Sequence, residues 1–525
     1  MIADRIFTNG TFVSLDDKDR VYGAAAVRDG KIVALGSDEA IERTAGINTK
    51  RFDLEGNTVL PGFIDSHQHM ISTGFHLRNV DCRVSSIAEL VAKIKRRAEA
   101  VDADDWVIGW GYDESRFAEG RHPTAADFKD VSRPVFVTHY SLHSAVANEL
   151  ALKKAGITPE TTVAHGEVEK DGRGRLTGRL SEDALELIKK QMRFTVSEMK
   201  EAIAAANAFY VRHGVTSVHE AGIGFYTGNF DEMRAFQETS ENGSRDVRVY
   251  GMILDDFYQE GDLLLGFRNE RFKTGAVKMF ADGTVSGKTA ALSMPYADGG
   301  TGEFMHGVGE IERKIMRAHR AGVQVAVHAI GDAAVSQVLT AYEKAIRAFP
   351  RGDCRHRIEH ASIITPALRD RMQKLGVIPV PQPGLVHFAG EVHMDHVPEP
   401  LSKGVFALHS FVEAGLLPAG SSDSPITPCD PLLGVYTAVT RRTALGNTIL
   451  PEQKLSLREA LCMYTRNAAR ASFDEDLKGT LEIGKLADFT VVSPGFMSFD
   501  EEQLKTAEVE MTIIGGIVVY RKGEE

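Results

Sequence analysis

The sequence predicts a (β/α)8 barrel joined to a small sheet domain that both ends of the chain build. Three observations support this prediction. Short apolar runs alternate with helical segments through the middle, both ends are rich in short strands and tight turns, and polar side chains follow several of the apolar runs. Strands that alternate with helices form parallel sheets, and eight such units close into a barrel, which a chain of 525 residues can contain with insertions.

The two ends of the chain have the same hairpin-like texture. Asn9-Gly10 and Asp29-Gly30 each stand between apolar runs, and both dipeptides tolerate the positive φ of a type I′ turn. Near the C-terminus, Gly515-Gly516 separates two further apolar runs. Since chain ends often lie close together, we assign residues 1–58 and 475–525 to one small sheet domain.

Residues 59–474 supply the predicted barrel. Its first strand belongs to an apolar run that begins at Thr58 and leads into His67 and His69. Residues 76–195 then form a stretch that is far too long for a loop, so we expect an inserted subdomain over the barrel mouth. Seven more strands are predicted at residues 215–219, 248–254, 276–280, 323–328, 357–360, 377–380 and 416–420.

Composition narrows the range of functions. Hydrophobic residues make up 43% and charged residues 26%, as in soluble globular proteins. The net charge of −12 argues against binding to nucleic acid or to an anionic membrane. We expect no signal peptide and no membrane span, and the four scattered cysteines predict reduced thiols in a cytoplasmic protein. The expected partner is a small-molecule substrate, and the sequence leaves open whether the chain forms a homodimer.

Ligand-type side chains stand at the predicted strand ends, where barrel enzymes place their active sites. His67 and His69 are two residues apart, so both can point to the same side of a strand and offer neutral nitrogen donors. The other candidates are Lys278, His328, His360 and Asp423. Together these residues predict a centre for one or two divalent metal ions, with zinc first and iron, manganese, cobalt or nickel as alternatives.

Several of these residues also have a purely structural interpretation. His328 can be a buried core histidine, His360 can belong to a surface salt bridge, and Asp423 can cap a helix. Lys278 lies in an apolar strand, where a buried ammonium is costly. Reaction with CO₂ would convert it into a carbamate, which is a carboxylate-like ligand able to bridge two metal ions.

Several motifs together resemble the amidohydrolase superfamily, and specifically amidohydrolase family 3, which includes enzymes like N-substituted formamide deformylase. The matching segments lie at residues 61–69, 109–114, 143–148, 277–283, 328–332, 357–361, 420–425 and 483–489. They span nearly the whole chain in the family's order. One departure is Ser424, where relatives often carry an aromatic residue, and it bears on substrate detail.

The resemblance implies a distorted barrel with a β-sandwich formed by both termini. It also implies that His67, His69 and Asp423 hold one metal ion and that His328 and His360 hold a second. Carboxylated Lys278 would bridge the two ions, although some members of the superfamily use a single ion.

The expected function is therefore that of a metal-dependent hydrolase that cleaves the C–N bond of an amide, formamide or related substrate, with Asp423 transferring the proton. Candidate substrate contacts are His143, His219, Trp110 and Tyr112. A lactonase or esterase would use the same ligands, and so would a phosphoesterase, for which Arg357 and Lys288 are the nearby cations. A non-catalytic regulatory protein that binds metal is the third possibility. We expect a flexible loop around His387–His396.

Overall fold

The computed structural model describes residues 2–102, 105–139, 144–163, 166–192, 194–242, 246–260 and 268–524. The chain divides into two compact units. The first combines Met1–Ser72 with Ala206–Glu525, and the second is Thr73–Ala205. Two helices contain the boundaries between them, α2 (Met70–Arg78) and α6 (Val196–Arg212).

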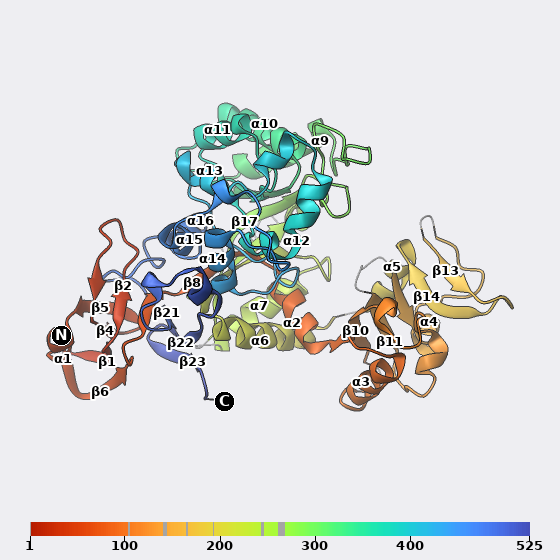
Figure 1. Ribbon diagram of the computed structural model, residues 1–525, viewed down its shortest axis with the longest axis horizontal. Helices are drawn as coiled ribbons and strands as arrows, with labels where there is room; N and C mark the ends of the chain where they lie inside the picture. The colour runs from red at the N-terminus through yellow and green to blue at the C-terminus, as the bar shows by residue number, and fades with distance from the viewer. Residues whose placement is uncertain are drawn as a thin grey trace. The chain divides into compact units, whose positions relative to one another are not determined.

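Seven parallel strands form the barrel sheet of the first unit, near the middle of Figure 1. In spatial order they are β8 (Phe63–Gln68), β15 (Val215–Ile223), β16 (Arg248–Leu254), β17 (Phe272–Phe280), β18 (Gln324–Ala329), β19 (Arg357–His360) and β20 (Ile378–Val380). Each lies where an apolar run predicted a barrel strand, and every neighbouring pair is parallel. The connecting helices are α7 (Asp231–Asn242), α8 (Asp255–Glu260), α9 (Val308–Arg320), α10 (Asp332–Ala348) and α11 (Pro366–Leu375).

The prediction of an eighth regular strand at residues 416–420 is wrong. This segment carries no strand assignment, yet it closes the barrel by single hydrogen bonds on both sides. Ala419 N–H donates to Pro379 O on β20, and Ser66 N–H on β8 donates to Gly420 O. Pro418 has no N–H to donate, and Gly420 N–H donates to Met463 O and not to a neighbouring strand. A continuous ladder of strand hydrogen bonds therefore cannot form.

The apolar run that begins at Thr58 is two strands in two sheets rather than one barrel strand. β7 (Thr58–Pro61) pairs with the sheet domain, and β8 begins the barrel after Gly62. A Cβ at Gly62 would lie 2.2 Å from Thr216 Oγ1, so only glycine allows this close passage from one sheet to the other.

Both ends of the chain contribute to two further sheets of the first unit. One has the order β5-β4-β1-β6 and the other β23-β22-β21-β7-β2-β3. Their strands are β1 (Ala3–Thr8), β2 (Thr11–Val13), β3 (Val21–Tyr22), β4 (Ala24–Arg28), β5 (Lys31–Gly36), β6 (Ala45–Asp53), β21 (Phe489–Val492), β22 (Val509–Ile514) and β23 (Ile517–Arg521). The short helices α1 (Asp38–Glu42), η5 (Phe496–Ser498) and α17 (Glu501–Lys505) complete these terminal regions.

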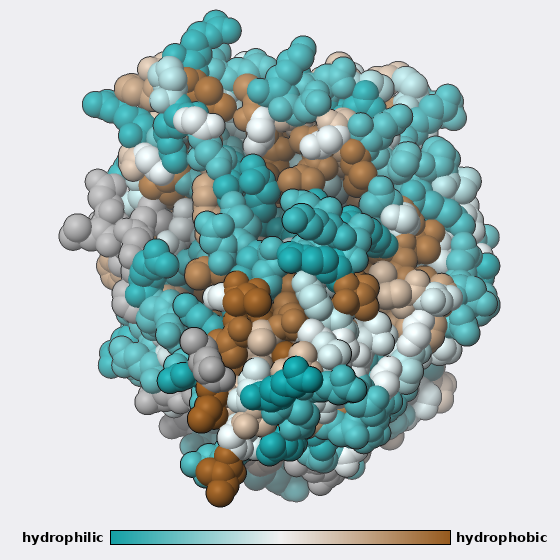
Figure 2. All heavy atoms as spheres, turned by 90° about the vertical axis from the view of Figure 1, so that its left-hand side faces the viewer, coloured by the Kyte–Doolittle hydropathy of each residue, from teal (hydrophilic) through white to brown (hydrophobic). Residues whose placement is uncertain are grey.

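The two terminal sheets share one hydrophobic core. Phe7 of β1 packs edge-on against Phe489 of β21, with ring centroids 5.8 Å apart, and Phe12 of β2 makes a similar contact with Phe489. Hydrophilic residues cover much of the face shown in Figure 2, which looks at the side where these sheets lie in Figure 1. The first and last segments of the chain therefore fold together, as their matching sequence texture indicates.

Local sequence explains the limits of the helices around the barrel. In α11, the Thr365 side chain accepts a hydrogen bond from Leu368 N–H, Pro366 occupies the first turn, and Gly376 ends the helix in the left-handed conformation. The helices after α11 are α12 (Pro383–His396), η3 (Leu401–Gly404), α13 (Leu408–Glu413), α14 (Pro431–Thr440), η4 (Pro451–Gln453), α15 (Leu457–Met463) and α16 (Arg466–Ala471). Residues 387–396 lie in α12, so the expected flexible loop is wrong.

The second unit contains a six-stranded sheet of order β13-β14-β12-β11-β10-β9. Helix α3 (Ile87–Glu99) buries Ile87, Leu90 and Ile94, which lie on one face, in a core shared with the sheet. The other elements are β9 (Val80–Asp81), β10 (Val107–Tyr112), η1 (Glu114–Arg116), η2 (Ala125–Phe128), β11 (Val135–His139), β12 (Ser144–Ala147), α4 (Glu149–Lys154), β13 (Val168–Lys170), β14 (Leu176–Ser181) and α5 (Asp183–Lys189).

All four cysteines are buried free thiols. Within the ranges that the structure describes, no helix has both the length and the apolar character that a membrane crossing needs.

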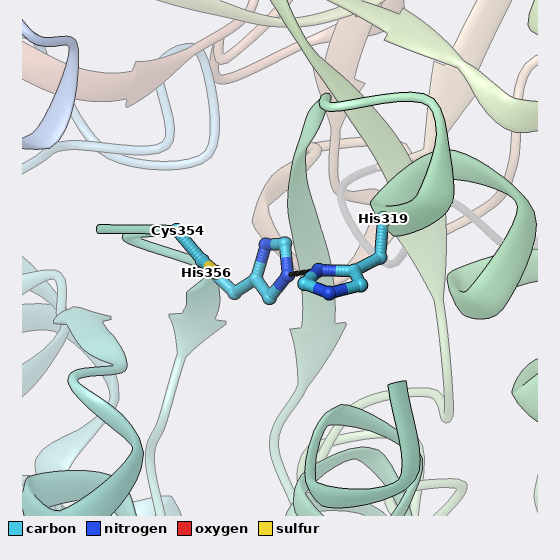
Figure 3. Close-up of side chains that lie close together, drawn as sticks. All are labelled: His319, Cys354 and His356. Carbon is cyan, nitrogen blue, oxygen red and sulfur yellow. Dashed lines mark hydrogen bonds between the residues drawn. The ribbon is translucent and has the colours of Figure 1, made fainter. Parts of the chain in front are cut away.

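Two buried histidines, His319 and His356, lie at the N-terminal end of the barrel and are hydrogen-bonded to each other (Figure 3). Their bond is part of a directional chain of hydrogen bonds. Val325 N–H donates to His356 Nδ1 at 3.0 Å, so the proton of His356 lies on Nε2. Nε2 donates to His319 Nδ1 at 2.8 Å, and His319 Nε2 donates to Phe349 O at 2.7 Å. The chain is complete only when both rings are neutral.

Acid should therefore weaken the fold through this pair. Burial lowers the pKa of His319. Burial also lowers the pKa of His356, to about 3, and the nearby charges of His319 and Arg351 act in the same direction. Below the unfolded value of about 6.5, the unfolded chain binds more protons than the folded chain, so stability falls as pH falls, and His356 alone contributes up to ~1.4 kcal/mol per pH unit. Denaturant unfolding at pH 7.5 and 5.5 measures this slope.

His356→Asn retains an oxygen acceptor for Val325 N–H and removes one titrating ring, so its unfolding free energy should depend less on pH than that of the wild type. His409→Asn, at an exposed position, serves as the matched control and should keep the wild-type slope. An unchanged slope in His356→Asn would contradict the assignment.

Candidate metal centre

The structure brings together three of the predicted metal ligands at the C-terminal end of the barrel. His67 lies near the end of β8, His69 directly follows that strand, and Asp423 lies beyond the irregular eighth segment. The Nε2 atoms of His67 and His69 each lie 3.4 Å from Asp423 Oδ1. Three nitrogen and oxygen donors thus converge on one small volume, which is an arrangement that fits a divalent metal ion.

Backbone geometry carries Asp423 to the two histidines. Its φ of 59° lies in the left-handed region, and its N–H donates to His67 O at 2.7 Å. Burial alone would raise the pKa of Asp423, but the contacts with His67 and His69 hold it well below its usual value. The side chain is therefore a carboxylate at neutral pH.

His328 and His360 form a second pair beside the first. Their ring centroids are 4.4 Å apart, and the His360 centroid lies 4.9 Å from that of His67. His360 Nδ1 donates to Gln382 Oε1, and His328 Nε2 donates to Gly283 O, so each ring keeps a lone pair on its other nitrogen. Burial lowers the pKa of both rings, that of His328 to about 4, which leaves them in the neutral form that binds metal.

Lys278 on β17 is 1% exposed in the same region. Among the described residues, no carboxylate lies within salt-bridge distance of its Nζ, which lies 4.6 Å from the centroid of the Phe280 ring. Burial lowers the pKa of Lys278 to about 8 despite the opposing influence of Glu359 and Asp423. The lower pKa increases the fraction of neutral amine, and the neutral amine is the form that can react with CO₂.

Glu359 holds His67 in place, and the sequence did not reveal this role. His67 Nδ1 donates to Glu359 Oε2 at 2.5 Å, and Arg357 donates to both oxygens of the same carboxylate. Burial alone would raise the pKa of Glu359, but the charge of Arg357 and the bond from His67 lower it well below its usual value. The carboxylate thus fixes the proton of His67 on Nδ1 and leaves the Nε2 lone pair toward Asp423.

Two more buried carboxyl groups lie near the candidate metal centre and were not predicted from the sequence. Asp65 on β8 accepts hydrogen bonds from Ser422 N–H and from His67 N–H, so it ties the strand to the loop that carries Asp423. Glu220 on β15 accepts from Met70 N–H at 2.6 Å and has Oε1 3.9 Å from His69 Nδ1, while burial raises its pKa to about 8. An acidic residue within an apolar run was the available signal at both positions.

The four candidate substrate contacts have different surroundings. His219 is completely buried, and its Nδ1 accepts a hydrogen bond from Arg357 while its ring packs edge-on against Tyr250. Trp110 and Tyr112 lie on β10 in the second unit, where Trp110 packs against His76, with ring centroids 3.9 Å apart. His143 lies outside the described residues. A substrate role for these four positions stays a prediction.

Comparisons with known proteins all find similarity to amidohydrolases or related metal-dependent hydrolases. The model of a family described as the amidohydrolase family matches residues 50–520. The Bacillus subtilis protein YtcJ is 32% identical over 97% of this chain and 98% of its own, and the N-substituted formamide deformylase of Arthrobacter pascens is 28% identical over 99% and 98%. A solved metal-dependent hydrolase from Pyrococcus horikoshii superposes with a TM-score of 0.81 at 28% identity, covering 95% of this chain and 99% of that one.

Glu359→Gln should weaken metal binding although Glu359 is not itself a predicted ligand. The change removes the charge that orients His67 and leaves buried Arg357 without its carboxylate, so we expect metal affinity to fall by about 10–100-fold. Competition with a chromophoric chelator measures the affinity.

Glu343→Gln, which alters a partly exposed ion pair with Arg371, is the matched control and should bind metal like the wild type. Wild-type affinity in Glu359→Gln would show that the buried carboxylate does not position His67.

Proposed function

The chain belongs to the amidohydrolase family, and we propose that it is a metal-dependent hydrolase that cleaves the C–N bond of a small amide, formamide or related substrate. One observation carries the proposal. His67, His69 and Asp423 present converging donor atoms beside two neutral histidines and a buried lysine, all at the C-terminal end of one barrel. The relationship to an N-substituted formamide deformylase supports a C–N substrate.

The donor set fits one or two divalent ions, zinc first. His67, His69 and Asp423 would hold one ion, His328 and His360 would hold the other, and carboxylated Lys278 would bridge them. These nitrogen and oxygen ligands suit zinc and its neighbours in the first transition row. A bound ion of this kind acidifies a water molecule and polarises a substrate carbonyl.

Asp423 is the residue that we assign to proton transfer. Its carboxylate accepts a proton from the attacking water as the oxygen bonds to the carbonyl carbon, and it returns that proton to the nitrogen as the C–N bond breaks. The products are a carboxylic acid and an amine. Glu359, Arg357 and Asp65 keep this arrangement fixed, because they hold His67 and the Asp423 loop in position.

The charges near the site favour a carbonyl substrate over a phosphate ester. A phosphoesterase needs accessible cations for its substrate, and the two candidates are Arg357 and Lys288. Arg357 is completely buried and donates to Glu359, Ser66 O and His219. Lys288 pairs with Asp298. Esters and lactones use the same ligands as amides, so a panel of N-acyl, N-formyl, ester and lactone compounds decides between them.

Asp423→Asn should abolish most of the activity that this panel detects. The amide keeps the size of the side chain but cannot accept the proton from water, so we expect turnover to fall by about 10²–10⁴-fold. Turnover close to that of the wild type would refute the assigned role. Glu413→Gln, on the exposed part of α13, is the control that should retain activity.

Lys278→Ala should lower the metal content of the purified chain, because it removes the proposed bridging carbamate. Elemental analysis by mass spectrometry measures the ions per chain, and added acetate should restore part of the loss by supplying a carboxylate. Lys344→Ala, at an exposed ion pair with Glu312, should leave the content unchanged. Two full equivalents in Lys278→Ala would exclude the bridge.

A further inference from the structure

An exposed phenylalanine lies beside one of the predicted metal ligands. Phe225 belongs to the loop after β15, and it is 60% exposed. The centroid of its ring is 6.3 Å from that of the His69 ring. The side chain of His69 is itself 23% exposed, whereas that of His67 is 1% exposed. Phe225 therefore lies next to the histidine of this pair that solvent, and hence a substrate, can reach.

A buried carboxylate fixes the loop that carries Phe225. The side chain of Glu232 is buried and accepts hydrogen bonds from three backbone N–H groups of this loop. The donors are Gly224, Tyr226 and Thr227, at 3.0, 2.6 and 2.8 Å. Two of them are the residues immediately before and after Phe225. The backbone is thus held on both sides of Phe225, and a loop of defined shape presents the ring to solvent.

Other accessible apolar side chains accompany the second pair of predicted ligands. Phe280 at the end of β17 is partly exposed, and the centroid of its ring is 5.5 Å from that of His328. Beside the end of this strand, Met305 N–H donates to Ala281 O at 2.8 Å, and Met305 is exposed. Ile426, in the loop beyond the irregular eighth segment, is also exposed. Apolar groups that solvent reaches therefore lie near both halves of the ligand set.

The surroundings of Phe225 differ from those of an ordinary exposed apolar residue. Single exposed hydrophobic side chains are common on protein surfaces and by themselves indicate nothing. The Phe225 ring contributes little to folding, because most of its surface stays in water. Yet the backbone on both sides of it is fixed by a buried carboxylate, and its ring lies beside a predicted ligand. Contact with a bound substrate is a role that explains these features together.

Building on the proposed hydrolase function, we propose that Phe225 is a specificity-determining residue that contacts an apolar, planar group of the substrate next to the scissile C–N bond. Flat apolar groups pack on an aromatic ring in offset-stacked or edge-to-face geometry. Aromatic rings also attract cations, but a cationic group here would be repelled by the divalent ions that the neighbouring ligands would hold. Substrates with an aromatic substituent are therefore preferred over substrates with a short alkyl group.

Two hydroxamates test this preference without any turnover. Acetohydroxamate and phenylacetohydroxamate share the group that chelates zinc and differ by one phenyl ring. Titration calorimetry on the zinc-loaded full chain should show tighter binding of the phenyl compound. Phe225→Ala should weaken the binding of phenylacetohydroxamate by about 5–30-fold and leave that of acetohydroxamate unchanged. Phe225→Tyr, which keeps the ring, should retain the preference.

Phe349→Ala is the matched control. Phe349 is also a partly accessible phenylalanine, but it directly follows α10, and its ring packs against the guanidinium group of Arg320. This variant should bind both hydroxamates as the wild type does. Equal affinities for the two compounds in the wild type, no binding of either compound, or an unchanged affinity ratio in Phe225→Ala would overturn the proposal.

The binding measurement separates this proposal from that of the hydrolase. If the chain prefers the phenyl compound but hydrolyses no member of the panel of N-acyl, N-formyl, ester and lactone compounds, the hydrolase proposal fails and the contact with Phe225 stands. If the panel is hydrolysed but the phenyl ring brings no gain in affinity, the hydrolase proposal stands and the role of Phe225 fails.

Discussion

A completely buried ion pair between Arg357 and Glu359 organises the interior of the barrel. Removing two charges from water costs several kcal/mol per ion, and the cost is recovered only if the remaining donors and acceptors are satisfied. Arg357 meets this condition by bonding both oxygens of Glu359, the carbonyl of Ser66 and the ring of His219. Three strands, β8, β15 and β19, are therefore locked together, and the tautomer of His67 follows from the same network.

The irregular eighth segment has a complementary role. A regular strand at residues 416–420 would be paired along its length, whereas the actual segment makes single hydrogen bonds to β20 and β8. The chain then continues beside β8, where Asp423 N–H donates to His67 O and His69 N–H donates to Ser424 O. Asp423 has a positive φ, and its side chain reaches His67 and His69. Asp65 on the neighbouring strand holds Ser422 by two further hydrogen bonds. Sparse pairing before residue 421 and the hydrogen bonds to β8 and Asp65 after it together position the carboxylate.

The sequence predicted what depends on local pattern and missed what depends on distant partners. Seven barrel strands are apolar runs bounded by turns, so their positions could be predicted, and strand ends brought His67 and Asp423 into one group. The division of the Thr58 run between two sheets could not be predicted, because its apolar residues suit either sheet. The role of Asp65 depends on Ser422, 357 residues away, and that of Glu359 depends on His67, 292 residues away. Neither pairing leaves a local pattern.

Clusters of histidine in this chain differ chiefly in where their protons lie. In the His319–His356 chain every nitrogen is used in a hydrogen bond, so the rings serve the fold. In His67 and His360 one nitrogen donates its proton to a buried acceptor and the other keeps a lone pair directed toward the shared site. Residue type and proximity are similar in both cases. The acceptors around each ring, Glu359 and Gln382 in one place and Phe349 O in the other, therefore decide whether imidazole can act as a ligand.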